Sequence, residues 1–88
     1  MSKINRDELN SYRATVAARA TFTMLDAAQD LQPIPQLIGT AALFLLLCET
    51  HGIEAQDVMT VTKNLMVSEG ERHPEFRAIA DYMHFELH

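Results

Sequence analysis

Twelve consecutive residues, Leu37 to Cys48, contain no charged side chain, and this run limits the possible folds more than any other part of the sequence. It consists of Leu, Ile, Gly, Thr, Ala, Ala, Leu, Phe, Leu, Leu, Leu and Cys, so a helix built from it is apolar on every side. A membrane-spanning helix needs about twenty apolar residues, and the run is shorter than that. We therefore expect a helix that is buried all round.

The remaining composition indicates one globular domain over residues 1–88. The chain is 48% hydrophobic and 22% charged, which is too apolar for a disordered chain, and its length leaves no room for a second core. A single cysteine excludes a disulfide framework, and we see no secretory leader, so we expect a cytoplasmic protein. The net charge of −5 makes a nucleic-acid partner unlikely and predicts no contact with an anionic membrane.

Proline, glycine and capping residues divide the chain into helices. Asn5 with Glu8 resembles a capping box, Pro35 and Gly52 bracket the apolar run, and Pro74 is placed to open a final helix. No segment shows the sustained alternation typical of strands. We therefore predict an all-α fold, a compact four-helix bundle-like domain with a central apolar second helix and no strands. The predicted helices cover about residues 6–30, 35–51, 54–68 and 74–87.

A homodimer is the expected form, because three short helices of one chain can hardly surround a fourth that is apolar all round. The first and last predicted helices also carry apolar side chains on two opposite faces. Exposed aromatic clusters of this kind are association sites. Alternatives are one broad apolar stripe whose aromatic side chains straddle its edge, or a site for another protein. The predicted interface residues are Phe22, Leu25, Tyr82 and Phe85.

Charge is unevenly distributed along the chain. Residues 1–19 carry four basic and two acidic side chains, a net charge of +2, whereas residues 20–88 carry three basic and ten acidic ones, a net charge of −7. We expect Glu49, Glu54 and Asp57 to form an acidic rim that guides a basic partner by speeding its association. Ordinary solvated helix faces would produce the same distribution.

A few residue groups could bind metal or act as catalysts, although ordinary structural roles explain them as well. Asp81, His84 and His88 are spaced so that their side chains could converge on one helix face, which suits zinc or iron. Cys48 and His51 form a Cys-x-x-His pair, but Cys48 ends the apolar run, where a thiol is normally packed and inert. No established catalytic or phosphate-binding motif is present. We expect neither an enzyme nor a bound cofactor.

A helix-turn-helix is the alternative for residues 47–66, which place Gly52 at a turn and apolar residues at inward positions of a following helix. The side chains that would enter the groove include Glu54 and Asp57, which would repel phosphates. Between Arg19 and Arg72 the only basic residue is Lys63. DNA binding is therefore the weaker hypothesis, and many plain helix pairs share this pattern.

The function predicted from the sequence is a small, acidic, non-catalytic protein-interaction or regulatory module. It would act as a homodimer that binds another, unidentified protein. Small accessory proteins of bacteria and their phages often have this composition, which is a loose analogy rather than a resemblance to a family.

Overall fold

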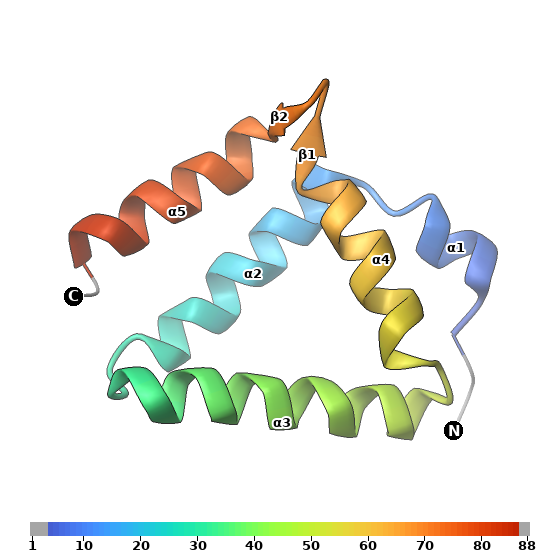
Figure 1. The fold of residues 1–88 in the computed structure, drawn as a ribbon, viewed down its shortest axis with the longest axis horizontal. Coiled ribbons are helices and arrows are strands. Elements are labelled where there is room, and N and C mark those ends of the chain that lie inside the picture. The colour runs from blue at the N-terminus through green and yellow to red at the C-terminus, as the bar shows by residue number, and fades with distance from the viewer. Residues whose placement is uncertain (1–3, 87–88) are drawn as a thin grey trace.

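The computed structural model describes residues 4–86, and most of them are helical, as the sequence predicts (Figure 1). The architecture contains five helices and one short hairpin rather than four helices. In chain order the elements are α1 (Arg6–Asn10), α2 (Ala14–Ala28), α3 (Pro33–His51), α4 (Ala55–Leu65), β1 (Val67–Ser68), β2 (Glu71–Arg72) and α5 (Pro74–Glu86).

Helix α3 contains the uncharged run and has the predicted boundaries to within two residues. It begins at Pro33 rather than Pro35, because both prolines lie in the first turn, where a backbone N–H is not needed. Gly52 ends the helix in the left-handed conformation, with φ 66° and ψ 39°. The N–H of Ile53 then donates to the carbonyl of Cys48 at 3.0 Å, which satisfies a carbonyl of the last turn.

The predicted helix over residues 6–30 is wrong, because the chain breaks between α1 and α2. Asn5 caps α1 by accepting from the N–H groups of Asp7 and Glu8. Ser11 ends it: its hydroxyl and its N–H both donate to the carbonyl of Asp7, at 2.8 and 3.1 Å. Arg13 is extended, with φ −90° and ψ 135°. A serine hydroxyl that competes for backbone groups ends the helix without glycine or proline.

The prediction that residues 54–68 form a helix and that there are no strands is also wrong at one place. Helix α4 ends at Leu65, and β1 pairs antiparallel with β2, with Val67 opposite Arg72. The turn residues Glu69 and Gly70 have φ values of 52° and 81°, the positive values that a two-residue type I′ turn requires. Two-residue strands are too short to show alternation in the sequence.

Helix α5 agrees with the predicted helix 74–87 as far as the last described residue. Pro74 begins it, and the Nδ1 atom of His73 accepts from the N–H of Glu75 at 3.3 Å. On its inner face Phe76 and Ile79 are buried against Ala18 of α2. These three residues form the hydrophobic core of the described chain, and the half-buried side chains packed against them are Ala14, Ala17, Leu25 and Met66.

Helices α2, α3 and α4 lie along three sides of a triangle (Figure 1). Met66, which directly follows α4, packs into the same core as Ala14 and Ala17 at the start of α2, so the triangle closes at that corner. Helix α3 connects the other two corners. The resulting molecule is flat, with extents of 37, 32 and 18 Å. The predicted four-helix bundle is therefore not the architecture of the single chain.

The prediction of a central helix 35–51, buried all round, is wrong for the single chain. Of the residues of α3, Cys48 alone is buried, whereas seven leucine and isoleucine side chains are 40–74% exposed. The physical reason is the triangle: α2 and α4 turn away from the ends of α3, and α5 lies against α2 instead. The exposed side chains are Ile34, Leu37, Ile38, Leu43, Leu45, Leu46 and Leu47.

Candidate functional site

The contact between α2 and α5 brings together three of the four predicted interface residues. The rings of Phe22 and Tyr82 lie 5.2 Å apart between centroids, tilted by 50°. Leu25 packs against the core formed with Phe76 and Ile79. These aromatic and aliphatic side chains therefore hold α2 to α5 within one chain, and Phe22, still 43% exposed, also reaches the surface. Their role in an interface between chains stays a prediction.

Phe85, the fourth predicted interface residue, lies apart from that contact. Its side chain is 74% exposed near the end of α5, and its ring meets the ring of His84 edge-on, with centroids 5.6 Å apart at 77°. A phenylalanine so far from the core adds nothing to the packing of the chain. It is available for contact with another molecule.

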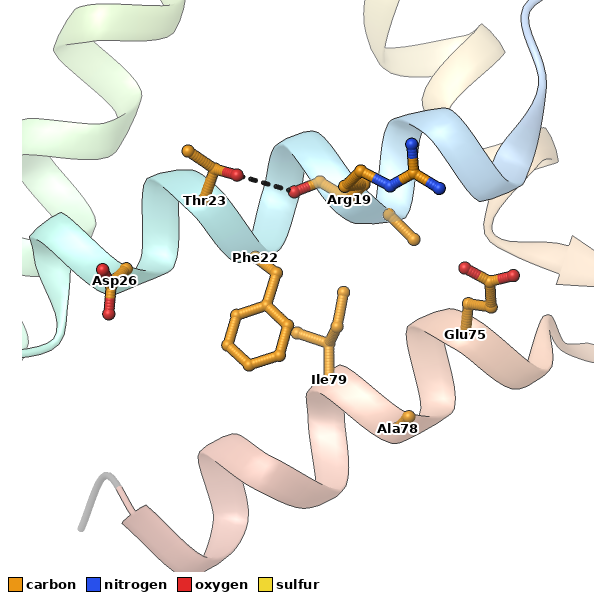
Figure 2. A pocket seen from close by; sticks show the side chains of 8 residues that line it. Arg19, Phe22, Thr23, Asp26, Glu75, Ala78 and Ile79 are labelled. Carbon is orange, nitrogen blue, oxygen red and sulfur yellow. Dashed lines mark hydrogen bonds between the residues drawn. The ribbon is translucent and has the colours of Figure 1, made fainter.

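An open groove of about 620 Å³ runs between α2 and α5 (Figure 2). Phe22 and Ile79 point toward one another across it, and charged side chains line its borders. Within residues 4–86, Arg19, Asp26 and Glu75 form no ion pair with one another. The groove thus combines an apolar interior with unpaired charges of both signs, which provides no catalytic set. Its lining residues are Ala18, Arg19, Phe22, Thr23, Asp26, Glu75, Ala78 and Ile79.

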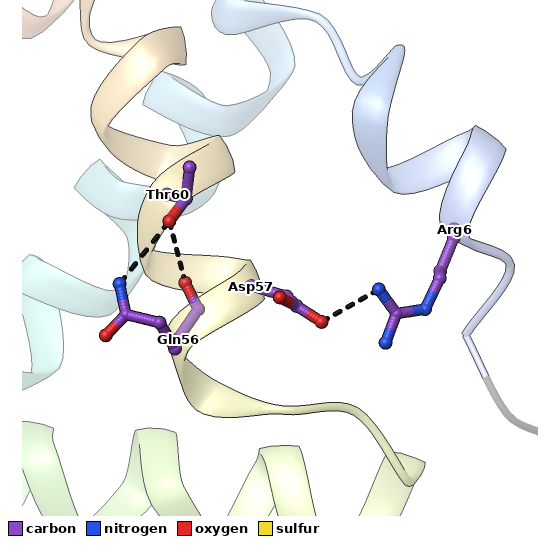
Figure 3. Close-up of polar contacts among 4 residues, drawn as sticks. All are labelled: Arg6, Gln56, Asp57 and Thr60. Carbon is purple, nitrogen blue, oxygen red and sulfur yellow. Dashed lines mark hydrogen bonds and ion pairs between the residues drawn. The ribbon is translucent and has the colours of Figure 1, made fainter.

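The predicted acidic rim lies around the corner between α3 and α4. Asp57 is engaged within the chain, because the guanidinium of Arg6 lies 2.8 Å from its carboxylate (Figure 3). Glu49, in the last turn of α3, and Glu54, at the start of α4, are exposed and make no ion pair with any residue of 4–86. Two of the three rim carboxylates therefore remain open to an external cation.

The same corner contains the segment 47–66 that resembles a helix-turn-helix. The end of α3, the turn at Gly52 and α4 do form two helices joined at a corner. Helix α1 contacts α4, and its Arg6 covers the Asp57 carboxylate near the first turn of α4 (Figure 3). Residues Gln56 and Thr60 of α4 bond to one another through Nε2 and Oγ1 at 3.4 Å. DNA binding through this segment stays an untested alternative.

The predicted metal ligands are only partly placed. Asp81 and His84 lie on α5, whereas His88 is outside the described residues. Between residues 4 and 86, no group of three or more His, Cys, Asp or Glu side chains is close enough to hold a metal ion. Cys48 is buried at the end of α3, and His51 is half-buried one turn later.

Among the described residues, α3 alone is long and apolar enough to cross a membrane, judged by length and composition. It has 19 residues, and its most apolar window has a mean hydropathy of 1.4. The uncharged run Leu37–Cys48 is shorter than this helix, because the first-turn prolines and a last polar turn extend it at both ends. Core helices of soluble proteins satisfy the same criterion, but here only 6% of the window is buried within the chain.

The total surface of the chain is also larger than its mass requires. The accessible surface is 6952 Å², whereas a compact folded monomer of 9.9 kDa is expected to expose about 5,200 Å². The excess is about 1,700 Å², and stable interfaces bury about 800 Å² on each partner. This excess, concentrated on α3, is the strongest functional signal in the molecule. The sequence predicted that α3 needs cover but placed the interface on α2 and α5.

Comparison with models of known protein families found no match, and no curated protein or solved structure is similar enough to be matched to this chain.

Proposed function

We propose that the protein is a small non-catalytic interaction module that associates with itself and acts by binding another protein. The observation that supports this most is the exposed apolar surface of α3, whose leucine and isoleucine side chains are 40–74% exposed. Apolar surface of this extent is costly in water and characteristic of protein interfaces. A homodimer covers it without any other component.

The acidic rim supports a second, basic partner. Glu49 and Glu54 are exposed without an internal ion pair, and the whole segment from Ala20 to Thr62 contains no lysine or arginine. Such a surface attracts a positively charged partner and raises its association rate, with less effect on the dissociation rate. The partner is therefore expected to present lysine or arginine side chains toward the α3–α4 corner.

Sedimentation equilibrium tests the self-association directly. The chain is expected to sediment with twice its monomer mass of 9.9 kDa at micromolar concentration. A sample that remains monomeric up to hundreds of micromolar would contradict the dimer.

The partner is tested by cross-linking in the native cell followed by purification. Its association rate should fall several-fold for Glu54→Lys and stay unchanged for the control Glu71→Lys, since Glu71 lies on β2, on the hairpin between α4 and α5. Equal rates for the two variants would remove the rim from the proposal, and the absence of any cross-linked protein would remove the partner.

A further inference from the structure

Helix α3 has an inward and an outward face. Its least exposed side chains, Gln36, Phe44, Cys48 and His51, recur every three to eight residues and lie on one side of the helix at about 100° per residue. The opposite side points away from the rest of the chain. It carries Ile38, Gly39, Ala42, Leu45 and Leu46, all of them exposed.

We infer that a second copy of the chain covers this outward face, with the two α3 helices antiparallel around a two-fold axis at Ala42. The inference rests on the proposed function, because it names the surface and the geometry through which the protein associates with itself. Ala42 lies at the middle of α3, which runs from Pro33 to His51. A small residue on the axis allows the two helices to approach closely.

The outward face is complementary to itself in this arrangement. With Ala42 on the axis, Ile38 lies opposite the partner's Leu46, and Gly39 opposite the partner's Leu45. Each large side chain thus meets either a neighbour of similar size or a gap, as ridges meet grooves between packed helices.

Gly39 supplies the gap and has no other explanation in the chain. A Cβ atom at Gly39 would meet nothing within 4 Å, so the fold of a single copy does not need a glycine there. Glycine is unfavourable inside a helix compared with alanine. The space above Gly39 is the size of a side chain from another molecule.

Charge favours the antiparallel direction. Glu49 lies near the end of the same face, and in a parallel pair it would stand beside the partner's Glu49. In an antiparallel pair it lies near the first turn of the partner's α3. That turn contains no acidic residue, and the side chain of its N-cap residue, Gln32, makes no capping bond. A carboxylate is stabilised at such a helix N-terminus.

The size of the surface suits a second copy. The seven exposed leucine and isoleucine residues present on the order of 700 Å² of apolar surface, above the 300–600 Å² of the largest patch on a typical monomer. A stable interface needs about 800 Å² per partner. The outward face of α3 together with its flanks provides most of that area.

A lipid bilayer fits the same helix less well. The nearest basic residues on either side of α3 are Arg19 and Lys63, whereas Asp26, Asp30 and Glu49 flank its apolar part. Helices at membranes are normally bordered by lysine and arginine. In addition, α2 and α4 return from both ends of α3 to one corner, so a crossing α3 would draw charged helices into the membrane.

Cysteine cross-linking tests the axis. In a Cys48→Ala background, Ala42→Cys is expected to form a disulfide-linked dimer on mild oxidation, because residues on a two-fold axis are within disulfide reach of their copies. The matched control Thr40→Cys changes an exposed residue on the opposite side of the helix and should stay uncross-linked. Ala42→Cys with Cys48 retained repeats the test in case the background substitution impairs folding.

A second pair of variants separates this inference from the proposed function. Gly39→Leu fills the gap and is expected to weaken dimerisation at least about tenfold while helicity is unchanged, whereas Thr40→Leu leaves dimerisation intact. A dimer that forms equally well with Gly39→Leu, or cross-links equally at residues 40 and 42, overturns the α3 pairing and leaves the proposed dimer standing. A wild-type monomer overturns both. Flotation of the wild-type chain with anionic vesicles, without a dimer in their absence, would assign α3 to the membrane instead.

Discussion

The hydroxyl of Tyr82 donates a hydrogen bond to the Oε1 atom of Gln29 at 2.8 Å and so joins the second half of α5 to the residue that ends α2. The bond is half-buried, and the Phe22 ring lies against the same tyrosine. The α2–α5 contact is therefore held by a polar bond beyond the small apolar core. It can be tested one side chain at a time.

Tyr82→Phe is expected to lower the free energy of unfolding by about 1 kcal/mol, because it removes this hydrogen bond and keeps the ring. Urea unfolding followed by circular dichroism measures the change. Gln29→Ala should produce a similar loss, and the double variant should lose less than the sum of the two, since both remove one bond. Additive losses would show that the bond contributes nothing.

Phe76→Ala is expected to destabilise the chain by about 3 kcal/mol or more, because Phe76 is 6% exposed at the centre of a very small core. Phe85→Ala provides the matched control. Phe85 is 74% exposed, so the same substitution should change the unfolding free energy by less than about 0.5 kcal/mol. If Phe85→Ala destabilises a dilute monomer as strongly, the position of α5 described above is wrong.

The hairpin predicts opposite effects at its two turn residues. Glu69 has a φ of 52°, which is unfavourable for glutamate, so Glu69→Asn should stabilise the chain by about 0.5 kcal/mol by creating the Asn-Gly pair preferred in type I′ turns. Gly70→Ala, at a φ of 81°, should destabilise it by about 1 kcal/mol. Thermal melts of both variants, at one protein concentration, check the signs.

The ion pair between Arg6 and Asp57 is expected to contribute little. Its side chains are 64% and 40% exposed, and pairs of this kind are worth about 0–1 kcal/mol. Asp57→Asn should therefore change the unfolding free energy by less than about 1 kcal/mol, and the difference from wild type should shrink as salt is raised to 1 M. A larger or salt-independent loss would indicate a role for Asp57 beyond this pair.

Dimerisation through an exposed surface predicts that stability depends on protein concentration. A dimer that unfolds to monomers gains stability by mass action, so the melting temperature should rise as the chain is concentrated a hundredfold. The melting temperature of Gly39→Leu should be nearly constant over the same range. A melting temperature of the wild type that does not move would argue against coupled association and folding.

Local signals predicted several elements well. Pro33, Pro35 and Gly52 bracket α3, and Pro74 begins α5, because the chemistry of these residues acts within a few positions along the chain. Signals of the same range failed at Ser11 and Glu69. A serine that turns its hydroxyl on its own helix, and a glutamate at positive φ, are unusual solutions that residue preferences do not indicate.

The arrangement of the helices could not be predicted in this way. An apolar run shows that α3 must lose contact with water, but it does not show which surface covers it. The expectation of a helix surrounded by its own chain assumed that α5 packs on α3, whereas Phe76 and Ile79 pack on Ala18 of α2. The predicted interface residues Phe22, Leu25 and Tyr82 were correctly identified as apolar partners, and the structure brings them together inside one chain.

The closed corner at Met66 makes the lengths of α2, α3 and α4 depend on one another. One residue inserted into α3 would rotate everything beyond it by about 100° and advance it by about 1.5 Å. Cys48 would leave its buried position, and Met66 would no longer reach Ala14 and Ala17. Natural variants of this protein are therefore expected to gain or lose residues at Leu31–Gln32 and at the hairpin tip, and to keep the number of residues in these three helices constant.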